Sequence, residues 1–247
     1  MYSRVTNTSE VRGVFSDKHI VPNLISDSYQ FKYVNLKFGF ETEPFMNHLG
    51  LAPSDSIHIS KFPAIEHSNP RNRKINSRYV VSFLGYPTKN KGHQHILEII
   101  KSVTKTNPNI TWQVHLYEND SIFQELKELE LDISIIIGKV DENVLQSAIT
   151  NSDLLCLPYS VTSFKLNASA MFYNSCDMLV PVITFFGSGF SADVQKFNCG
   201  SVVNSLEEMI LNISQINDES LLKWRLGCSE FNRYRNEKNL EFLDIPH

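Results

Sequence analysis

Short apolar segments alternate with amphipathic segments along most of the chain, from residue 79 to residue 236. The apolar segments are rich in Val, Ile, Leu and Phe, and they predict strands at 79–84, 110–117, 133–138, 153–157, 180–185 and 201–203. The segments between them predict helices at 92–106, 121–130, 141–151, 169–178, 191–198 and 205–216, with a last helix at 218–236. Most of the strands lack strict apolar–polar alternation, which is typical of strands covered on both faces. The pattern therefore predicts an α/β fold with a Rossmann-like, doubly wound parallel sheet.

The loops that follow the predicted strands are the expected location of a binding site. Ligands of doubly wound sheets bind outside the carboxyl ends of the strands. We therefore expect five loops to converge on one crevice, namely 85–92, 117–121, 138–141, 158–169 and 186–191.

The first 75 residues are less regular than the rest of the chain. We expect a short strand within 14–21, a helix opening at Pro22, a helix at 43–49 and a strand at 57–59. The segment 66–77 is polar, contains a proline and three basic residues, and has the composition of a linker. These features predict a short N-terminal α/β unit in front of the larger domain.

Composition and charge narrow the class of protein. Of the 247 residues, 42% are hydrophobic and 20% are charged, which is enough apolar material for a full core. The net charge of −4 argues against nucleic acid as a partner, because binding to its backbone depends on Lys and Arg. No apolar run approaches the roughly 20 residues of a membrane span, and the N-terminus lacks the pattern of a signal peptide. The expected location is the cytoplasm.

Cysteine and histidine spacing predicts no metal site. The four cysteines are scattered without a CxxC pair, so we expect reduced thiols and neither a zinc site nor a disulfide framework. His93 and His95 are two residues apart on a predicted helix, so their rings point in different directions. The sequence thus predicts no metal and no cofactor.

The segment from Tyr79 to Leu97 has the features of an anion site. A strand runs into Gly85, a polar loop carries Lys89 and Lys91, and a helix is predicted after Gly92. Helix N-termini bind anions, and cations beside them are mildly unfavourable unless an anion compensates. We predict that this loop binds an anion such as a diphosphate; the alternative is a solvated helix start.

A second anion-binding loop is predicted at 158–169. It follows a buried strand and precedes a helix for which Asn167 or Ser169 would be the N-cap. Free backbone N–H groups near Ala170 suit phosphate oxygens, and Lys165 would neutralise the same charge. A plain capped helix explains Ser169 equally well.

Several separated motifs resemble the donor-binding, C-terminal domain of GT-B glycosyltransferases, in particular the retaining nucleotide-sugar enzymes of family four. Phe83-Leu84-Gly85 with Asn90-Lys91-Gly92 resembles their first loop, FxG…KG, and Gly138-Lys139-Val140 resembles their GxV turn. Further similar segments, in the family's order, are the strand and loop at 152–159, the PVI strand at 180–183 and the late GxVV unit at 200–203. The resemblance covers about 140 residues.

The resemblance implies roles for particular residues. Lys91 and Lys165 would be the catalytic cations that stabilise the leaving diphosphate. The expected donor-binding residues are Gly85, Lys89, Asn90, Gly138, Lys139, Val140, Asn167, Ser169, Ala170 and Asn174.

One departure from the family concerns the donor ribose. Many members carry Glu-x7-Glu before the PVI strand, and the second Glu holds the ribose; Leu166 and Asn174 occupy these places here. The chain is closer to a variant pattern represented by Phe164, Ser169 and Ala170. An amide at Asn174 would bind a hydroxyl less strongly than a carboxylate does.

A second departure is length. GT-B enzymes have an acceptor domain comparable in size to the donor domain, whereas about 75 residues precede Tyr79 here. The resemblance divides the chain into a partial acceptor-side segment at 1–75, a donor domain at 76–218 and a C-terminal helix at 219–247 that returns toward the N-terminal segment.

The expected function is transfer of a sugar from a nucleotide-diphosphate sugar to a hydroxyl acceptor, in bacterial surface polysaccharide or lipopolysaccharide biosynthesis. Expected partners are the nucleotide sugar and a saccharide or lipid-linked acceptor, with either a peripheral location at the inner face of the membrane or a partner subunit that supplies the acceptor domain. One alternative is a non-catalytic nucleotide-sugar-binding subunit or a decayed fragment of such an enzyme. Another is a sugar epimerase with a GT-B fold, for which the sequence lacks evident histidines and acids in the expected loops.

Overall fold

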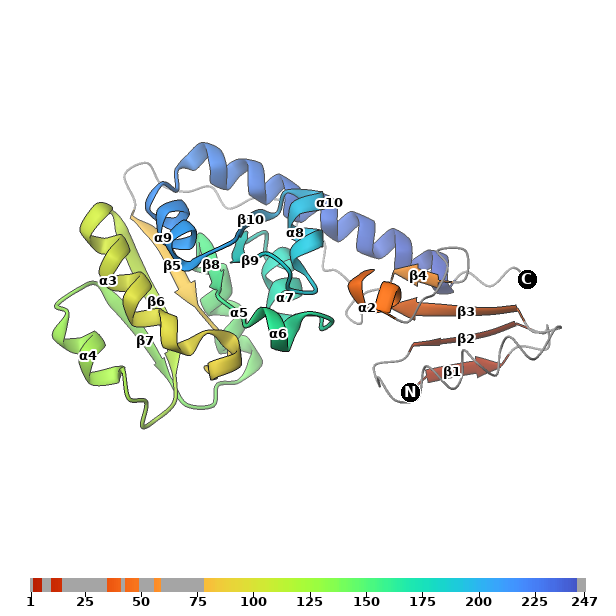
Figure 1. Ribbon diagram of the computed structural model, residues 1–247, viewed down its shortest axis with the longest axis horizontal. Helices are drawn as coiled ribbons and strands as arrows, with labels where there is room; N and C mark the ends of the chain where they lie inside the picture. Colours follow the sequence, from red (N-terminus) through yellow and green to blue (C-terminus); the bar gives the residue numbers. More distant parts are fainter. Residues whose placement is uncertain are drawn as a thin grey trace.

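The larger of two sheets forms the centre of the chain. The computed structural model describes residues 2–5, 10–14, 35–40, 43–48, 56–58 and 78–243. The larger sheet is entirely parallel, has the strand order β10-β9-β8-β5-β6-β7 and is shown in Figure 1. Its strands are β5 (Tyr79–Phe83), β6 (Ile110–Leu116), β7 (Ile133–Ile137), β8 (Leu154–Leu157), β9 (Val182–Phe185) and β10 (Gly200–Val203).

This strand order is doubly wound. The chain builds β5, β6 and β7 outward in one direction, crosses back, and places β8 on the other side of β5 before continuing outward to β9 and β10. The point where the direction reverses lies between β5 and β8. It is the position at which loops diverge and leave a crevice above the sheet. The predicted fold class is confirmed.

Helices cover both faces of the sheet. They are α3 (Ile96–Thr106), α4 (Phe123–Glu128), α5 (Glu142–Thr150), α6 (Val161–Phe164), α7 (Ala170–Asp177), α8 (Ser191–Phe197), α9 (Leu206–Ser214) and α10 (Asp218–Leu243). One hydrophobic cluster packs α3, α4 and α9 against the sheet, and the other packs α5, α7, α8 and α10. Strand β8 contributes side chains to both clusters, because successive side chains of a strand point to opposite faces. Leu154 and Cys156 belong to the first cluster, and Leu155 and Leu157 belong to the second. Burial on both faces explains its wholly apolar sequence.

Two local predictions were wrong. The helix expected from residue 92 begins as α3 at Ile96, after the short 3-10 helices η2 (Lys89–Lys91) and η3 (His93–His95). Gly92 separates these two turns with φ = 78°, in the left-handed region, which an α-helix cannot include. Helix α6 was not expected; it has 4 residues and is capped by Ser160. The other strands and helices from residue 79 onward lie where they were predicted, within a few residues at most ends.

The smaller sheet lies in the N-terminal part of the chain. It contains β1 (Tyr2–Val5), β2 (Glu10–Val14), β3 (Asn35–Phe40) and β4 (Ser56–His58), with β1 antiparallel to β2 and the others parallel. Helix α2 (Glu43–His48) and β4 match the helix and strand predicted at 43–49 and 57–59. The strand predicted within 14–21 meets β2 at Val14, while its remainder, the helix after Pro22 and the linker at 66–77 lie outside the described residues.

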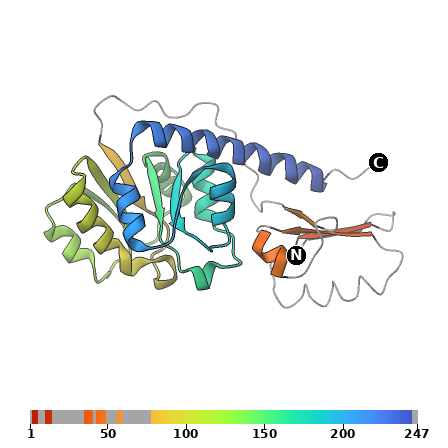
Figure 2. The ribbon, with the colours of Figure 1, turned by 45° about the horizontal axis from the view of Figure 1, so that its top comes forward.

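The last helix reaches from the large sheet to the small one. Helix α10 packs on α7 and α8 and also contacts β4. Figure 2 shows it running along the larger domain and continuing toward the N-terminal sheet. The division into segments 1–75, 76–218 and 219–247 stays a prediction. Within the described ranges, no helix has the length and apolar character to cross a membrane.

Candidate functional site

Two loops meet above the point where the sheet reverses direction. Gly92, in the loop after β5, lies so close to the loop after β8 that a Cβ atom on it would be 2.1 Å from the carbonyl oxygen of Pro158. The backbone N–H of Ser160 donates to the carbonyl oxygen of Asn90 at 2.8 Å. The loops predicted at 85–92 and 158–169 are therefore joined through their backbones.

The loop after β9 joins the same group. The backbone N–H of Gly189 donates to the carbonyl oxygen of Phe164 at 2.7 Å, and a Cβ on Gly189 would be 2.6 Å from the carbonyl oxygen of Asn167. Three of the five predicted loops thus contact one another.

Lys91 is a half-buried cation at the centre of this region. Its Nζ lies 3.7 Å from the position that a Cβ on Gly85 would occupy, so the ammonium group sits over the glycine at the end of β5. Burial lowers the pKa of Lys91, because desolvation penalises the charged form. Within the described part of the chain, no carboxylate forms an ion pair with it. A desolvated cation without a counter-charge is a place where an anion gains most from binding.

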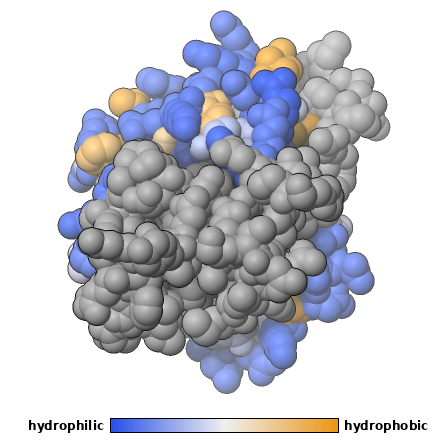
Figure 3. Space-filling model, turned by 90° about the vertical axis from the view of Figure 1, so that its right-hand side faces the viewer, coloured by the Kyte–Doolittle hydropathy of each residue, from blue (hydrophilic) through white to orange (hydrophobic). Residues whose placement is uncertain are grey.

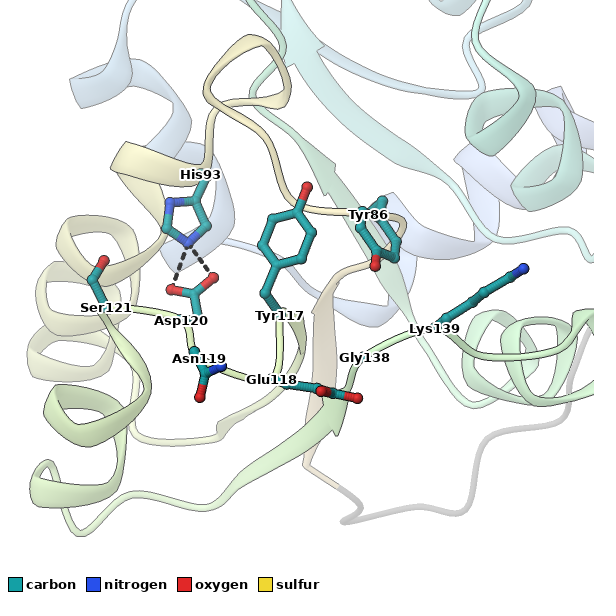
Figure 4. A pocket seen from close by; sticks show the side chains of 9 residues that line it. All are labelled: Tyr86, His93, Tyr117, Glu118, Asn119, Asp120, Ser121, Gly138 and Lys139. Carbon is teal, nitrogen blue, oxygen red and sulfur yellow. Dashed lines mark hydrogen bonds and ion pairs between the residues drawn. The ribbon is translucent and has the colours of Figure 1, made fainter.

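An open pocket of about 700 Å³ lies at the carboxyl ends of β5, β6 and β7 (Figure 4). It is lined by Tyr86, His93, Tyr117, Glu118, Asn119, Asp120, Ser121, Gly138 and Lys139. A smaller cavity of about 20 Å³ includes Gly85, Lys91, Pro158 and Tyr159 in its lining and shares Tyr86 and His93 with the larger pocket. Because Tyr86 and His93 border both, the two cavities adjoin each other.

Two tyrosines form an aromatic wall of this pocket. The rings of Tyr86 and Tyr117 meet edge to face with centroids 4.6 Å apart, and the side chains remain 43% and 36% exposed. Figure 4 shows both projecting from loops at the strand ends into the same space. Exposed aromatic rings in a concave site offer a flat surface on which a planar group can stack.

A histidine–aspartate pair fixes the opposite wall. His93 Nε2 lies 2.8 Å from both carboxylate oxygens of Asp120, whose side chain is 2% exposed. Asp120 also accepts the backbone N–H of Ile122 at 3.1 Å. The pair ties the turn before α3 to the loop after β6.

His115 anchors the turn after β7. Its Nε2 contacts the carbonyl oxygen of Gly138 at 2.6 Å, which makes Nε2 the protonated nitrogen and leaves Nδ1 as an acceptor. The N–H of Gly138 donates to Leu116 at 2.9 Å. Both backbone groups of Gly138 are therefore engaged within the protein, so any backbone contact from the predicted GxV turn to a ligand falls to Lys139 or Val140.

The N-terminus of α7 is capped as the sequence predicted. Ser169 is buried, and its hydroxyl accepts the backbone N–H of Phe172 at 3.2 Å. It also contacts the hydroxyl of Tyr159, which lowers the pKa of that tyrosine slightly against the much larger rise caused by burial. Asn167, the alternative cap, donates instead to the carbonyl oxygen of Ser163.

The predicted site residues fall into two groups. Gly85, Lys91, Gly138 and Lys139 line the two cavities, and the backbone of Asn90 joins the loops. The cavities are not lined by Lys89, Val140, Lys165, Asn167, Ser169, Ala170 or Asn174. Of these, Lys89 and Lys165 are exposed and Asn174 is partly buried.

Sequence reasoning missed the pocket's most distinctive side chains. Tyr86 directly follows Gly85, and Tyr117 and Glu118 directly follow β6. Aromatic and charged residues immediately after parallel strands are a usable signal, since such positions face the ligand edge of the sheet. No three His, Cys, Asp or Glu side chains in the described ranges are placed to hold a metal ion.

Solved structures of glycosyltransferases share the fold of this chain. No protein-family model and no curated protein sequence matches the chain. Among solved structures, a TarM variant from S. aureus in complex with fondaparinux, alpha-GlcNAc-glycerol and UDP superposes with a TM-score of 0.62 at 15% identity, over 95% of this chain and 50% of that one. WaaG, a glycosyltransferase involved in lipopolysaccharide biosynthesis, gives 0.52 at 14% identity, over 92% and 70%. HepE of Anabaena in complex with UDP-glucose gives 0.56 at 13% identity, over 94% and 70%.

The chain has the fold of these glycosyltransferases, so the predicted likeness to the GT-B architecture is confirmed at the level of fold. It spans about half the length of TarM. At these identities the comparison concerns the backbone, and the chemistry of the site depends on this chain's own residues.

Proposed function

We propose that this chain binds a nucleotide-diphosphate sugar above β5 and β8 and transfers the sugar to a hydroxyl acceptor. The observation that carries the proposal is Lys91, a half-buried ammonium group at the carboxyl edge of the sheet with no carboxylate partner in the described residues. The small cavity that Lys91 lines shares Tyr86 and His93 with a pocket of about 700 Å³, which is large enough for the nucleoside.

In this proposal the diphosphate lies over Gly85, within reach of Lys91, and the base stacks in the pocket beside Tyr86 and Tyr117. TarM and HepE, which share the fold, were crystallised with UDP and UDP-glucose, and this supports a nucleotide sugar as the ligand. Asn174 on α7 would donate to a ribose hydroxyl.

The chemical step transfers charge to the diphosphate. The bond between the anomeric carbon and the β-phosphate oxygen breaks, its electron pair stays on the diphosphate, and the acceptor oxygen bonds to the anomeric carbon. The proton of the acceptor hydroxyl passes to the departing diphosphate or to water. Lys91 would stabilise the developing charge from a site where water is partly excluded. The exposed Lys89 and Lys165, on the same two loops, would add to it at longer range. We assign no metal and no cofactor to this step.

The proposal also includes a biosynthetic pathway and a cellular location. WaaG is described as acting in lipopolysaccharide biosynthesis, which supports a bacterial surface polysaccharide or lipopolysaccharide as the product. Four buried cysteines without disulfide bonds are typical of a reducing compartment and support a cytoplasmic location, at the inner face of the membrane if the acceptor is lipid-linked. A partner subunit would supply contacts to the acceptor.

A non-catalytic nucleotide-sugar-binding subunit is the second candidate. The observation that favours it is the pair Leu166 and Asn174, which occupy positions where related enzymes carry carboxylates. Such a chain would bind the donor and leave it intact.

Calorimetric titration with a nucleoside diphosphate tests binding, with Lys91→Ala compared against Lys89→Ala. We expect Lys91→Ala to lower affinity about 10-fold or more and Lys89→Ala to have a much smaller effect, because Lys89 is exposed. Equal affinity for the wild type and Lys91→Ala would refute the role of Lys91. Labelled nucleotide sugars incubated with acceptor extracts then separate the two candidates, since binding without transfer contradicts the enzyme.

A further inference from the structure

Glu118 is an exposed carboxylate in the lining of the large pocket. Its Cγ and Oε1 atoms lie 3.2 Å from the position that a Cβ on Gly138 would occupy, so a residue other than glycine at 138 would displace it. Gly138 has φ = 72° and is fixed through His115, so the space over it is a built feature of the turn. Figure 4 shows the Glu118 side chain running beneath Gly138.

The charges around Glu118 leave it free to accept hydrogen bonds. Within the described residues it forms no ion pair, and the nearby carboxylate of Asp120 is occupied by His93 and the backbone of Ile122. Lys139 is exposed on the rim and is not ion-paired with Glu118. An ionised carboxylate only accepts hydrogen bonds, so its ligand must supply donors.

The four nucleobases differ in the donors that they can offer to a carboxylate. Guanine carries adjacent N1–H and N2–H₂ donors on one edge, which match the two oxygens of a carboxylate. Uracil offers a single N–H flanked by two carbonyl oxygens, and these would face the negative charge. Adenine and cytosine each offer one amino group next to an unprotonated ring nitrogen. Only guanine therefore satisfies a carboxylate with a pair of donors and no repulsion.

The geometry points to guanine as the base of the donor, with Glu118 as the residue that selects it. This inference rests on the proposed binding of a nucleotide-diphosphate sugar and specifies its class as a guanosine diphosphate sugar. The pocket volume of about 700 Å³ accommodates a purine, and the edge-to-face tyrosine pair gives it a stacking surface. The solved structures with UDP share only 13–15% identity with this chain, so their base is no guide to the one bound here.

Titration calorimetry of the full chain with GDP, UDP and inorganic pyrophosphate tests this assignment. We expect GDP to bind at least about 10-fold more tightly than UDP, because guanine can donate two hydrogen bonds to the Glu118 carboxylate and uracil cannot. Glu118→Gln should lower GDP affinity by about the same factor and leave UDP affinity unchanged or higher, because the amide adds a donor for a uracil oxygen. Glu128→Gln is the matched control, with the same charge change at an exposed position on α4 outside the pocket, and should change neither affinity.

The outcomes separate this inference from the proposed function. If UDP binds as tightly as GDP, or if GDP selectivity survives Glu118→Gln, the assignment of Glu118 is overturned while diphosphate binding stands. If neither nucleotide nor pyrophosphate binds, the proposed function falls and the base assignment falls with it.

Discussion

Gly92 shows at the scale of one residue how the site is assembled. Its φ of 78° lies in the left-handed region, and a Cβ would be 2.1 Å from the carbonyl oxygen of Pro158. We expect Gly92→Ala to lower the free energy of unfolding by at least about 2 kcal/mol, since it combines backbone strain with a clash against backbone. Urea denaturation measures this loss.

Gly85 supplies the matched control. Its φ of 89° is equally left-handed, but the nearest atom to an added Cβ is the flexible end of Met171, at 3.0 Å. Gly85→Ala should therefore cost only the backbone strain, about 1–2 kcal/mol. An equal loss for both variants would show that the contact between the two loops is not tight.

The depressed pKa of Lys91 gives a prediction about protons. Because burial lowers this pKa below 10.5, the unfolded chain binds the proton more tightly, and stability rises as pH increases from the folded-state value toward 10.5. A bound diphosphate favours the charged form and raises the pKa again. At a pH between the lowered folded-state pKa of Lys91 and the ordinary lysine value, nucleoside diphosphate binding should therefore take up protons. Calorimetry in two buffers of different ionisation enthalpy detects the uptake.

Lys91→Arg distinguishes this lysine from other titrating groups. Arginine keeps its charge throughout the range, so the variant should bind the diphosphate without proton uptake. Undiminished uptake in Lys91→Arg would mean that another group titrates and that Lys91 does not contact the ligand.

The individual residues of the site were only partly predictable from sequence. Lys91, Gly85 and Gly138 could be found because loops after parallel strands face a common edge. Tyr117 and Glu118 also follow a strand directly, but they were missed because their role depends on the pocket that three separate loops form around them. The cap of α7 was predicted as Asn167 or Ser169, and the structure selects the buried Ser169.

At the scale of elements, α10 is attached to the larger domain by two buried ion pairs. Arg225 contacts Asp153 at the start of β8 at 2.8 Å, and both side chains are less than one-tenth exposed. Arg235 forms an ion pair with Asp177 at the end of α7 and packs over the rings of Tyr173 and Phe231. These pairs fix the helix that continues toward the N-terminal sheet.

Removing one member of the first pair should be costly. Arg225→Met leaves the charge of Asp153 buried, with only the backbone N–H of Val80 among its described partners besides the arginine, so we expect unfolding free energy to fall by about 3–5 kcal/mol. Adding Asp153→Asn removes the uncompensated charge and should restore part of the loss. A double variant whose loss equals the sum of the two single losses would contradict this account, because coupled charges are not additive.

Strands and helices from residue 79 onward were largely predictable, because apolar periodicity reports burial directly. The start of α3 was not, since Gly92 and two 3-10 turns depend on the contact with Pro158. Helix α6 was missed because 4 residues are too few to show a helical period.

At the scale of the whole molecule, the described residues visible on one face are mostly polar (Figure 3). Figure 3 shows hydrophilic side chains around the visible rim, with hydrophobic ones in small separate patches. The exposed Leu222 and Leu226 are one turn apart on α10, and Leu211 lies on α9. Scattered apolar residues of this kind are ordinary for a protein surface. The molecule's main chemical asymmetry is the carboxyl edge of the large sheet, where Lys91 and the pocket lie.

The measurement that tests the account most directly is a crystal structure of the chain with a bound nucleoside diphosphate. We predict that diphosphate oxygens lie within hydrogen-bonding distance of Lys91 Nζ and that the base stacks in the pocket beside Tyr86 and Tyr117. A nucleotide bound elsewhere on the chain, with Lys91 still facing solvent and the pocket empty, would contradict the central claim.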